Sequence, residues 1–228
     1  MAFNYSPKIV TDGLILYLDA ANPRSYTSGS TSWVDLSRGG NNGTLVNGPT
    51  FSSAHGGSIV FDGTNDYVDL GGSLNLKPTT SITVSTWIRF NAMVANVRAL
   101  SDWHQNGATD RWIFYITDSN TIQWYLLTNS FASAVPFSPV LLNTWYNFTG
   151  VYDGISQIFY VNGVFHNSTS KTGTMNTSNT SQPVRLGGQV SAGGYHNGNI
   201  STTLIYNRAL TATEVLQNYN ATKTRFGL

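Results

Sequence analysis

The sequence contains no cysteine and few charged residues. Its 12 Lys and Arg against 11 Asp and Glu make up 10% of 228 residues, whereas an average globular protein has roughly 25%. Without cysteine there is no disulfide framework, no cysteine-based zinc site and no thiol chemistry. Because the formal net charge is +1 and the basic residues do not cluster, we expect no nucleic-acid groove, which needs a basic face for phosphates.

Long apolar runs are also missing, which bears on membrane insertion and secretion. No run approaches the roughly 20 residues of a membrane-spanning helix, so we expect no membrane insertion. The opening MAFNYSPKIV has no apolar signal region, and we expect no secretory signal peptide. Hydrophobic residues make up 40% and aromatic residues 13% of the chain, which argues against disorder. The length fits a single all-β domain.

Alternation of apolar and polar residues dominates the sequence. In residues 81–90, Ile, Val, Thr, Ile and Phe share one face, the pattern of a strand with one buried side. Asp153-Gly154 and Asn162-Gly163 suit hairpin turns, whose central residues need positive φ. About a dozen short strands with no helix between them predict an all-β antiparallel sandwich or barrel. The predicted strands are 14–19, 58–61, 67–70, 81–90, 99–103, 111–117, 121–127, 144–152, 156–161, 164–166, 184–187 and 199–206.

One helix is predicted near the C-terminus. Thr211 and Glu214 form a capping-box pattern, in which each side chain binds a backbone amide of the other residue. The apolar residues that follow predict a helix over 211–219. In contrast, residues 167–182 are almost wholly Ser, Thr, Asn, Gly and Lys, and this composition predicts a long exposed loop.

These elements divide the chain into one domain and two terminal segments. We assign residues 1–12 to an N-terminal arm, 13–219 to the domain and 220–228 to a C-terminal tail. The arm carries Phe3, Tyr5 and Ile9, which would be exposed apolar surface in a monomer. We therefore expect the arm to dock on a neighbouring subunit or another particle protein, and the chain to form a homo-oligomer.

The segments follow a recognisable order: GLILYLDAANPRSY, SWVDLSRGGNNGTLVNGPTF, GGSIVFDGTNDYVDLG, SITVSTWIRF, NTWYNFTGVYDGISQIFYVNGV and GNISTTLIYNRALTATEVLQNY. This order resembles a laminin-G-like domain of the concanavalin A-like lectin/glucanase superfamily, over about residues 13–219. The resemblance implies a jelly-roll sandwich of two curved antiparallel sheets. The opening KIVTDGLILYLDAANPRSY also resembles the start of laminin-G-like structural proteins encoded by tailed phages.

Catalysis is not expected, although the superfamily contains glycoside hydrolases. Retaining hydrolysis needs two neighbouring carboxyl groups, which the laminarinase-type relatives carry as Glu-x-Asp-x-Glu on one strand. This chain has a single glutamate, Glu214, which belongs to the capping box. No strand offers alternating aspartates, and no Gly-x-Ser-x-Gly elbow is present to activate a serine. We assign no catalytic residue.

The resemblance also raises a calcium site, because many relatives bind Ca²⁺ at the rim of the sandwich. In the pentraxin branch one ligand lies before the strand that matches 111–117, where this chain has Asp110. The second acidic cluster matches a segment that here contains Gln189 and no carboxylate. Calcium prefers two or more carboxylates, so we expect at most one weakly bound ion, at Asp110. Asp19 and Asp35 are another oxygen pair, for which turn and capping roles are favoured.

A glycan site is predicted on two loops. Sugar sites combine an aromatic platform with planar polar groups, because a pyranose ring has apolar faces and hydroxyl edges. The loops DWHQNG and GGYHNG have that chemistry, and the family topology places them at the same rim as Asp110. The predicted glycan-binding residues are Trp103, His104, Asp110, Gln189, Tyr195 and His196.

Three functional hypotheses follow for a chain of this kind. The first is a virion surface protein, either a capsid decoration or a tail-associated adhesin, with capsid or tail proteins as partners and host-surface glycans as weak multivalent ligands. The second is a free-standing, extracellular bacterial lectin or carbohydrate-binding module. The third is a purely structural module that packs against neighbouring proteins.

Overall fold

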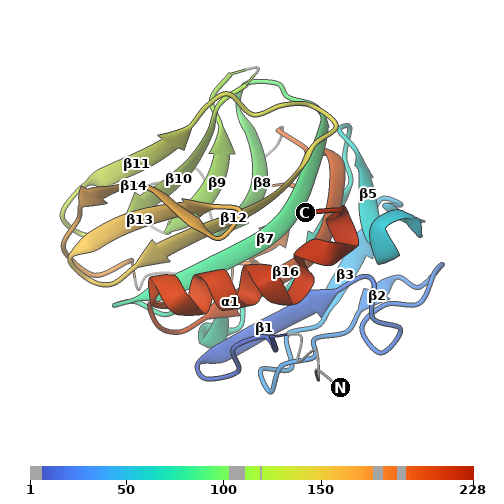
Figure 1. Cartoon of the computed structure of the whole chain (residues 1–228), viewed down its shortest axis with the longest axis horizontal. Helices are drawn as coiled ribbons and strands as arrows, with labels where there is room; N and C mark the ends of the chain where they lie inside the picture. Colours follow the sequence, from blue (N-terminus) through green and yellow to red (C-terminus); the bar gives the residue numbers. More distant parts are fainter. Residues whose placement is uncertain (1–6, 103–110, 119, 177–181, 189–193) are drawn as a thin grey trace, which may run out of the picture.

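The computed structural model describes residues 7–102, 111–118, 120–176, 182–188 and 194–228. Two eight-stranded sheets form the two layers of a sandwich (Figure 1). Sheet A has the order β14-β13-β12-β7-β16-β5-β4, with β1 also paired to β16. Its strands are β1 Leu14–Asp19, β4 Thr50–Ser52, β5 Ser58–Asp62, β7 Ile82–Ala92, β12 Trp145–Tyr152, β13 Ser156–Val161, β14 Val164–Ser170 and β16 Asn197–Tyr206.

Sheet B forms the opposite layer, in the order β11-β10-β9-β8-β15-β6-β3-β2. Neighbouring strands pair antiparallel in both sheets. The predicted all-β class, with two antiparallel sheets and one short C-terminal helix, is confirmed. The strands of sheet B are β2 Ser32–Trp33, β3 Gly43–Val46, β6 Tyr67–Asp69, β8 Val97–Asp102, β9 Trp112–Ile116, β10 Ile122–Leu127, β11 Ala132–Phe137 and β15 Arg185–Leu186.

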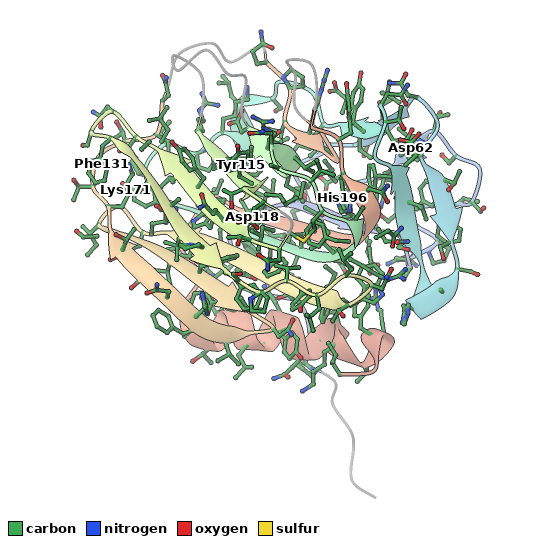
Figure 2. The ribbon with its side chains drawn as sticks, turned by 90° about the horizontal axis from the view of Figure 1, so that it is seen from above. Asp62, Tyr115, Asp118, Phe131, Lys171 and His196 are labelled. Carbon is green, nitrogen blue, oxygen red and sulfur yellow. The ribbon has the colours of Figure 1, made fainter. Side chains whose placement is uncertain are left out.

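The main core lies between the sheets, where side chains fill the interior (Figure 2). Alternation along β7 sends Ile88 and Phe90 into this core, as the sequence predicts. Phe114 and Trp124 of sheet B enter the same core, and the centroids of these two rings lie 5.1 Å apart. A Cβ added to Gly150 of β12 would lie 2.3 Å from the Trp124 indole. The lack of a side chain at Gly150 therefore lets the bulky indole of one sheet approach the backbone of the other.

A C-terminal helix covers the outer face of sheet A (Figure 1). Helix α1 spans Ala212–Thr222, and its capping box between Thr211 and Glu214 is present as predicted. The Arg208 guanidinium pairs with the Glu214 carboxylate at 2.6 Å and holds the pKa of Glu214 at about 2. The helix runs three residues beyond its predicted end at 219, and the 3₁₀ helix η3 follows over Lys223–Phe226.

Residues 220–228 are therefore not a separate tail. The side chain of Phe226 packs in a cluster with Trp87 and Trp145 on the outer face of sheet A. The Trp87 and Phe226 rings stack with their centroids 4.0 Å apart. Trp87 and Trp145 are both buried, and their cluster lies beneath the helix and not between the sheets.

Several elements escape the sequence pattern for identifiable reasons. Strands β2 and β4 have two and three residues, which is too short for alternation to register. Strand β11 contains Pro136, which lacks a backbone donor and is tolerated because β11 is an edge strand. Strand β14 extends to Ser170, into the predicted loop 167–182; it is exposed along almost all its length, so no apolar alternation marks it.

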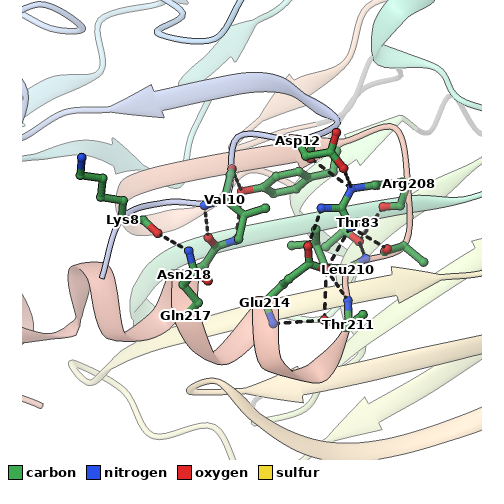
Figure 3. Close-up of polar contacts among 12 residues, drawn as sticks. Lys8, Val10, Asp12, Thr83, Arg208, Leu210, Thr211, Glu214, Gln217 and Asn218 are labelled. Carbon is green, nitrogen blue, oxygen red and sulfur yellow. Dashed lines mark hydrogen bonds and ion pairs between the residues drawn. The ribbon is translucent and has the colours of Figure 1, made fainter. Parts of the chain in front are cut away.

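The N-terminal arm packs on its own chain over the described residues 7–12 (Figure 3). Val10 is buried, and its amide donates to the Asn218 side chain at 2.9 Å. The Tyr206 hydroxyl donates to the Val10 carbonyl at 2.9 Å, and Gln217 donates to the Lys8 carbonyl at 2.7 Å. The prediction that residues 1–12 form an arm free to dock elsewhere is wrong for this stretch, because its apolar side chains complete the cluster beneath α1. Phe3 and Tyr5 lie outside the described residues.

Among all the residues that the structure describes, no helix is long and apolar enough to span a bilayer.

Candidate functional site

The structure describes only part of the predicted glycan site. Trp103, His104, Asp110 and Gln189 lie outside the described residues, and their predicted roles stay predictions. Tyr195 and His196 are described, and the structure separates their roles.

His196 is not a surface residue. Its side chain is fully buried between Phe61 and Phe90, with ring centroids 5.7 Å and 5.1 Å away. Burial lowers the pKa of His196 to about 3, so the imidazole is neutral at physiological pH. The prediction that His196 contacts a glycan is therefore wrong for this conformation. Alternation explains the error, because the residue after Tyr195 points into the sandwich just before β16 begins.

Tyr195, by contrast, is half-buried and lies over sheet B. A Cβ added to Gly188 would lie 3.1 Å from the Tyr195 ring and 3.5 Å from the Cβ of Tyr67. The backbone carbonyl of neighbouring Gly194 accepts a hydrogen bond from the Arg98 amide at 3.1 Å. Tyr195 thus lies over Gly188, which also faces Tyr67 of β6.

The outer face of sheet B carries further tyrosines in register. Arg98 of β8 pairs with Tyr115 of β9, and Ile113 pairs with Tyr125 of β10. Their sequence neighbours on these strands, such as Phe114 and Trp124, point into the core. Because successive residues of a strand alternate between faces, Arg98, Tyr115 and Tyr125 share the outer face. Figure 2 labels Tyr115.

These outward side chains line a pocket of about 200 Å³ formed by Arg98, Ile113, Tyr115 and Tyr125. The Arg98 guanidinium lies over the Tyr115 ring, 5.1 Å from its centroid. The Tyr115 hydroxyl donates to the Asn96 side chain at 2.5 Å. Burial lowers the pKa of Arg98, which still leaves the guanidinium charged at neutral pH. The pocket thus combines two phenol rings with one cation.

A second tyrosine–arginine pair lies farther along the same sheet. The Arg185 guanidinium of β15 covers the Tyr67 ring of β6 at 4.1 Å. Its Nε lies 3.4 Å from the Asp69 carboxylate on the neighbouring strand. Unlike Arg98, Arg185 therefore carries its own counter-charge. At both positions on the outer face of sheet B, a tyrosine ring lies beneath an arginine.

Buried ion pairs hold the strand ends beside this face. Asp102, the last residue of β8, accepts from Arg111 at 3.0 Å and lies 4.0 Å from the Lys77 ammonium. All three side chains are almost fully buried, so this aspartate is a structural residue and not part of an exposed sugar-binding loop. The pairs fix the points where the chain leaves β8 and enters β9.

The candidate oxygen pair Asp19 and Asp35 has structural partners. Asp19 makes a two-pronged ion pair with Arg225 at 2.7 and 2.8 Å. Asp35 accepts from three backbone amides, those of Tyr17, Ser37 and Asn41, at 2.8 to 2.9 Å. Asp35 therefore has the favoured turn role, whereas Asp19 binds mainly the Arg225 guanidinium. Among the described ranges, no group of three or more His, Asp or Glu side chains is arranged to hold a metal ion.

Comparison with known proteins identifies the family. A laminin G domain model, described as the concanavalin A-like lectin/glucanases superfamily, matches residues 62–216. The chain belongs to this superfamily. Among curated proteins, none matches the sequence significantly.

Solved structures of low sequence identity share the fold of this superfamily member. Domain 4 of AbnA, an extracellular arabinanase from Geobacillus stearothermophilus solved with arabinotriose, is 16% identical with a TM-score of 0.70, covering 92% of this chain and all of that domain. The binding domain of Paraclostridial Mosquitocidal Protein 1 is 18% identical with a TM-score of 0.69, covering 92% of this chain and 52% of that one.

The receptor binding domain of botulinum neurotoxin type G is also similar, with 18% identity and a TM-score of 0.65 over 91% of this chain and 51% of that one. The superfamily member therefore spans about half the length of the toxin domains that it matches. The two toxin structures are binding domains by their descriptions, and the arabinanase structure is domain 4 of that enzyme in complex with arabinotriose.

Sequence reasoning missed the outer-face residues Arg98, Tyr115 and Tyr125. Alternation in RWIFYI and TIQWYLL separates the tyrosines from the core residues, so this signal was available. It does not say which face of which sheet is left uncovered. The structure decides this, because α1 covers the outer face of sheet A.

Proposed function

We propose that this chain is a non-catalytic glycan-binding protein and that the outer face of sheet B is its binding surface. The observation that carries this proposal is the pocket where Arg98 and two tyrosines meet. A pyranose ring offers an apolar face to a phenol ring, while its hydroxyl edge suits guanidinium and phenol groups. Tyr195 and Tyr67 extend the aromatic surface beyond the pocket.

The comparisons support the proposal by analogy of fold. The arabinanase domain is a relative in complex with arabinotriose, and the toxin relatives are receptor or binding domains. Fold alone does not assign function, so the side chains of the proposed face are the argument that is specific to this chain.

The chemistry of the proposed face suits binding and not hydrolysis. Glycoside hydrolysis needs two carboxyl groups that flank the bond to be broken. The single glutamate, Glu214, is tied to Arg208 and to the start of α1, on the outer side of the other sheet. Asp69, on the proposed face, is paired with Arg185.

The affinity of one site is expected to be weak. One or two aromatic contacts and a few hydroxyl hydrogen bonds give a dissociation constant of about 1 mM, or ~4 kcal/mol. Useful adhesion then needs many copies, because linked sites gain avidity by raising the effective concentration.

A glycan array probed with a multimerised form of the protein tests the proposal. We expect Tyr115→Ala to reduce binding to every recognised glycan by about tenfold, since it removes a stacking ring. The matched control is Phe165→Ala, which removes an exposed aromatic residue from the edge of sheet A and should leave binding unchanged. Equal loss in both variants, or no binding by the native chain, would reject this face as a glycan site.

The predicted rim residues are tested in the same array. Trp103→Ala and Asp110→Ala, with and without chelator, determine whether the loops that hold Trp103, His104, Asp110 and Gln189 extend the binding surface. Binding that needs Asp110 and is lost in chelator would establish a calcium-dependent contact. If neither substitution nor the chelator changes binding, the site is confined to sheet B.

We further propose that the glycan-binding protein acts on a virion surface, as a capsid decoration or a tail-associated adhesin. The support is the phage-like opening of the sequence together with the low charge and the Ser, Thr and Asn richness. Mass spectrometry of purified particles would detect the chain among capsid or tail proteins. Its recovery as a free extracellular protein would favour the bacterial lectin hypothesis.

A further inference from the structure

Arg98 lacks the acidic partner that Arg111, the other buried arginine among the described residues, has. Arg98 is 7% exposed, and within the described part of the chain its Nε has no hydrogen-bond partner. Its Nη1 donates to the Asn96 backbone carbonyl, which carries no charge. Across the described ranges no carboxylate forms an ion pair with Arg98. Among the described residues, the ring beneath the guanidinium is that of Tyr115.

Other shielded arginines show what Arg98 is missing. Arg111 pairs with Asp102 at 3.0 Å, and Arg185 pairs with Asp69 at 3.4 Å. Arg208 and Arg225 each bind a carboxylate in the same way. A buried cation without a counter-charge is costly, because desolvation is not offset. Arg98 keeps this unbalanced charge at the wall of the pocket that it lines with Ile113, Tyr115 and Tyr125.

We infer that the Arg98 pocket binds the carboxylate of an acidic sugar. This inference rests on the proposed glycan-binding function and names the ligand class of the same face. A guanidinium is planar and binds carboxylates through two parallel hydrogen bonds. Ile113, Tyr115 and Tyr125 form the rest of the pocket wall, and the apolar face of the same sugar can lie against this wall.

The size of the pocket limits what enters it. Its volume of about 200 Å³ is below the roughly 300–1,000 Å³ typical of pockets for drug-sized ligands. One charged sugar unit therefore occupies the pocket, and the remaining units of an oligosaccharide extend over the outer face toward Tyr67 and Tyr195. Near Arg185, the Tyr67 ring adds an aromatic contact. Arg185 itself attracts an anion only weakly, because Asp69 already neutralises its charge.

The test uses pairs of glycans that differ only in charge. Oligosaccharides of uronic and nonulosonic acids are printed both as free acids and as neutral methyl esters, and are probed with the multimerised full-length chain. We expect the native chain to prefer the free acids by about 10- to 100-fold, the effect of one charge-assisted contact. The preference should fall as sodium chloride rises, because salt screens an accessible ion pair.

Two arginine variants separate the pocket from general electrostatics. Arg98→Gln should abolish the preference for the free acid while retaining weak binding to the methyl esters. Arg185→Gln removes the same charge from the same face and should retain the preference. Arg98→Lys keeps the charge but not the two-pronged geometry, and should show an intermediate preference. Thermal unfolding of each variant checks that the fold is retained.

The outcomes distinguish this inference from the proposed function. Equal binding of acids and esters by the native chain overturns the inference and leaves glycan binding intact. An equal loss of preference in Arg98→Gln and Arg185→Gln also overturns it, since net charge and not the pocket would then select the ligand. The absence of binding to any glycan overturns both proposals.

Discussion

At the residue scale, a histidine illustrates how position outweighs residue type. His196 follows Tyr195 in a loop rich in Gly and Asn, a context typical of binding loops. In the folded chain it lies fully buried against Phe61 and Phe90. The neutral imidazole acts there as a core side chain. Its two nitrogens do not reach solvent and cannot make the glycan contact that the sequence suggests.

Burial of His196 makes stability depend on pH. Its folded-state pKa, about 3, is below the unfolded value of roughly 6.5. The stabilising effect of the neutral form is therefore fully present above pH 6.5 and is lost as the pH falls toward 3. Below pH 6.5 the unfolded state binds the extra proton, so the free energy of unfolding decreases by up to ~1.4 kcal/mol per pH unit.

Urea unfolding of His196→Leu between pH 4 and 8 tests this linkage. The variant should lose the part of the pH dependence that titrates near 6.5. The exposed His166 provides a matched control, and His166→Leu should keep the native pH profile. If His196→Leu retained that profile, another group would have to account for it.

At the element scale, the C-terminal helices act as a cover for sheet A. Trp87 is central to this contact: its indole stacks on Phe226 at 4.0 Å and its Nε1 donates to Thr222 at 2.8 Å. The outward-facing positions of β7 are thus buried by α1 and η3, and not left to water. Because one side chain contacts both helices, its removal should loosen them together.

Trp87→Ala is expected to lower the free energy of unfolding by about 3–5 kcal/mol, as for other buried large-to-small changes. Equilibrium urea unfolding measures the loss. Phe165→Ala, at an exposed position, should cost less than about 1 kcal/mol. Similar values for the two variants would show that the helices are held elsewhere. The companion prediction, that Trp103→Ala costs much less than Trp87→Ala, is tested in the same experiment.

At the scale of the whole molecule, the two chain ends stabilise each other. Val10 near the N-terminus and Asn218 near the C-terminus are joined through their hydrogen bond and through the Tyr206 hydroxyl. Burial raises the pKa of Tyr206, so its hydroxyl stays protonated and able to donate. Asp12 and Arg208 add an ion pair at 2.9 Å.

Deleting residues 2–10 should therefore destabilise the entire domain. The buried Asn218 and Tyr206 groups would each lose a partner, at about 1–3 kcal/mol per group, and the melting temperature should fall by several degrees. Differential scanning calorimetry measures the change. Deleting residues 2–6 removes none of these contacts and serves as control. An unchanged melting temperature after the longer deletion would restore the view of residues 1–12 as a free arm.

Local rules in the sequence were sufficient for much of the fold. Alternation along β7, β9 and β10 marks their buried faces, and the Thr211–Glu214 pattern marks the start of α1, because each depends on residues close in the chain. The Asx turn at Asp62, whose carboxylate accepts from the Thr64 amide at 2.7 Å, follows from the same local chemistry. The order of such segments was enough to indicate the family.

The candidate site depended on contacts between residues distant in sequence. The sequence could not show that α1 covers the outer face of sheet A, that His196 turns inward, or that Tyr195 lies beside Tyr67. It also could not show that, within the described ranges, Arg98 has no acidic partner while Arg185 has Asp69. Strand order decides these features, because β6, β8 and β15 become neighbours only when the sheet forms.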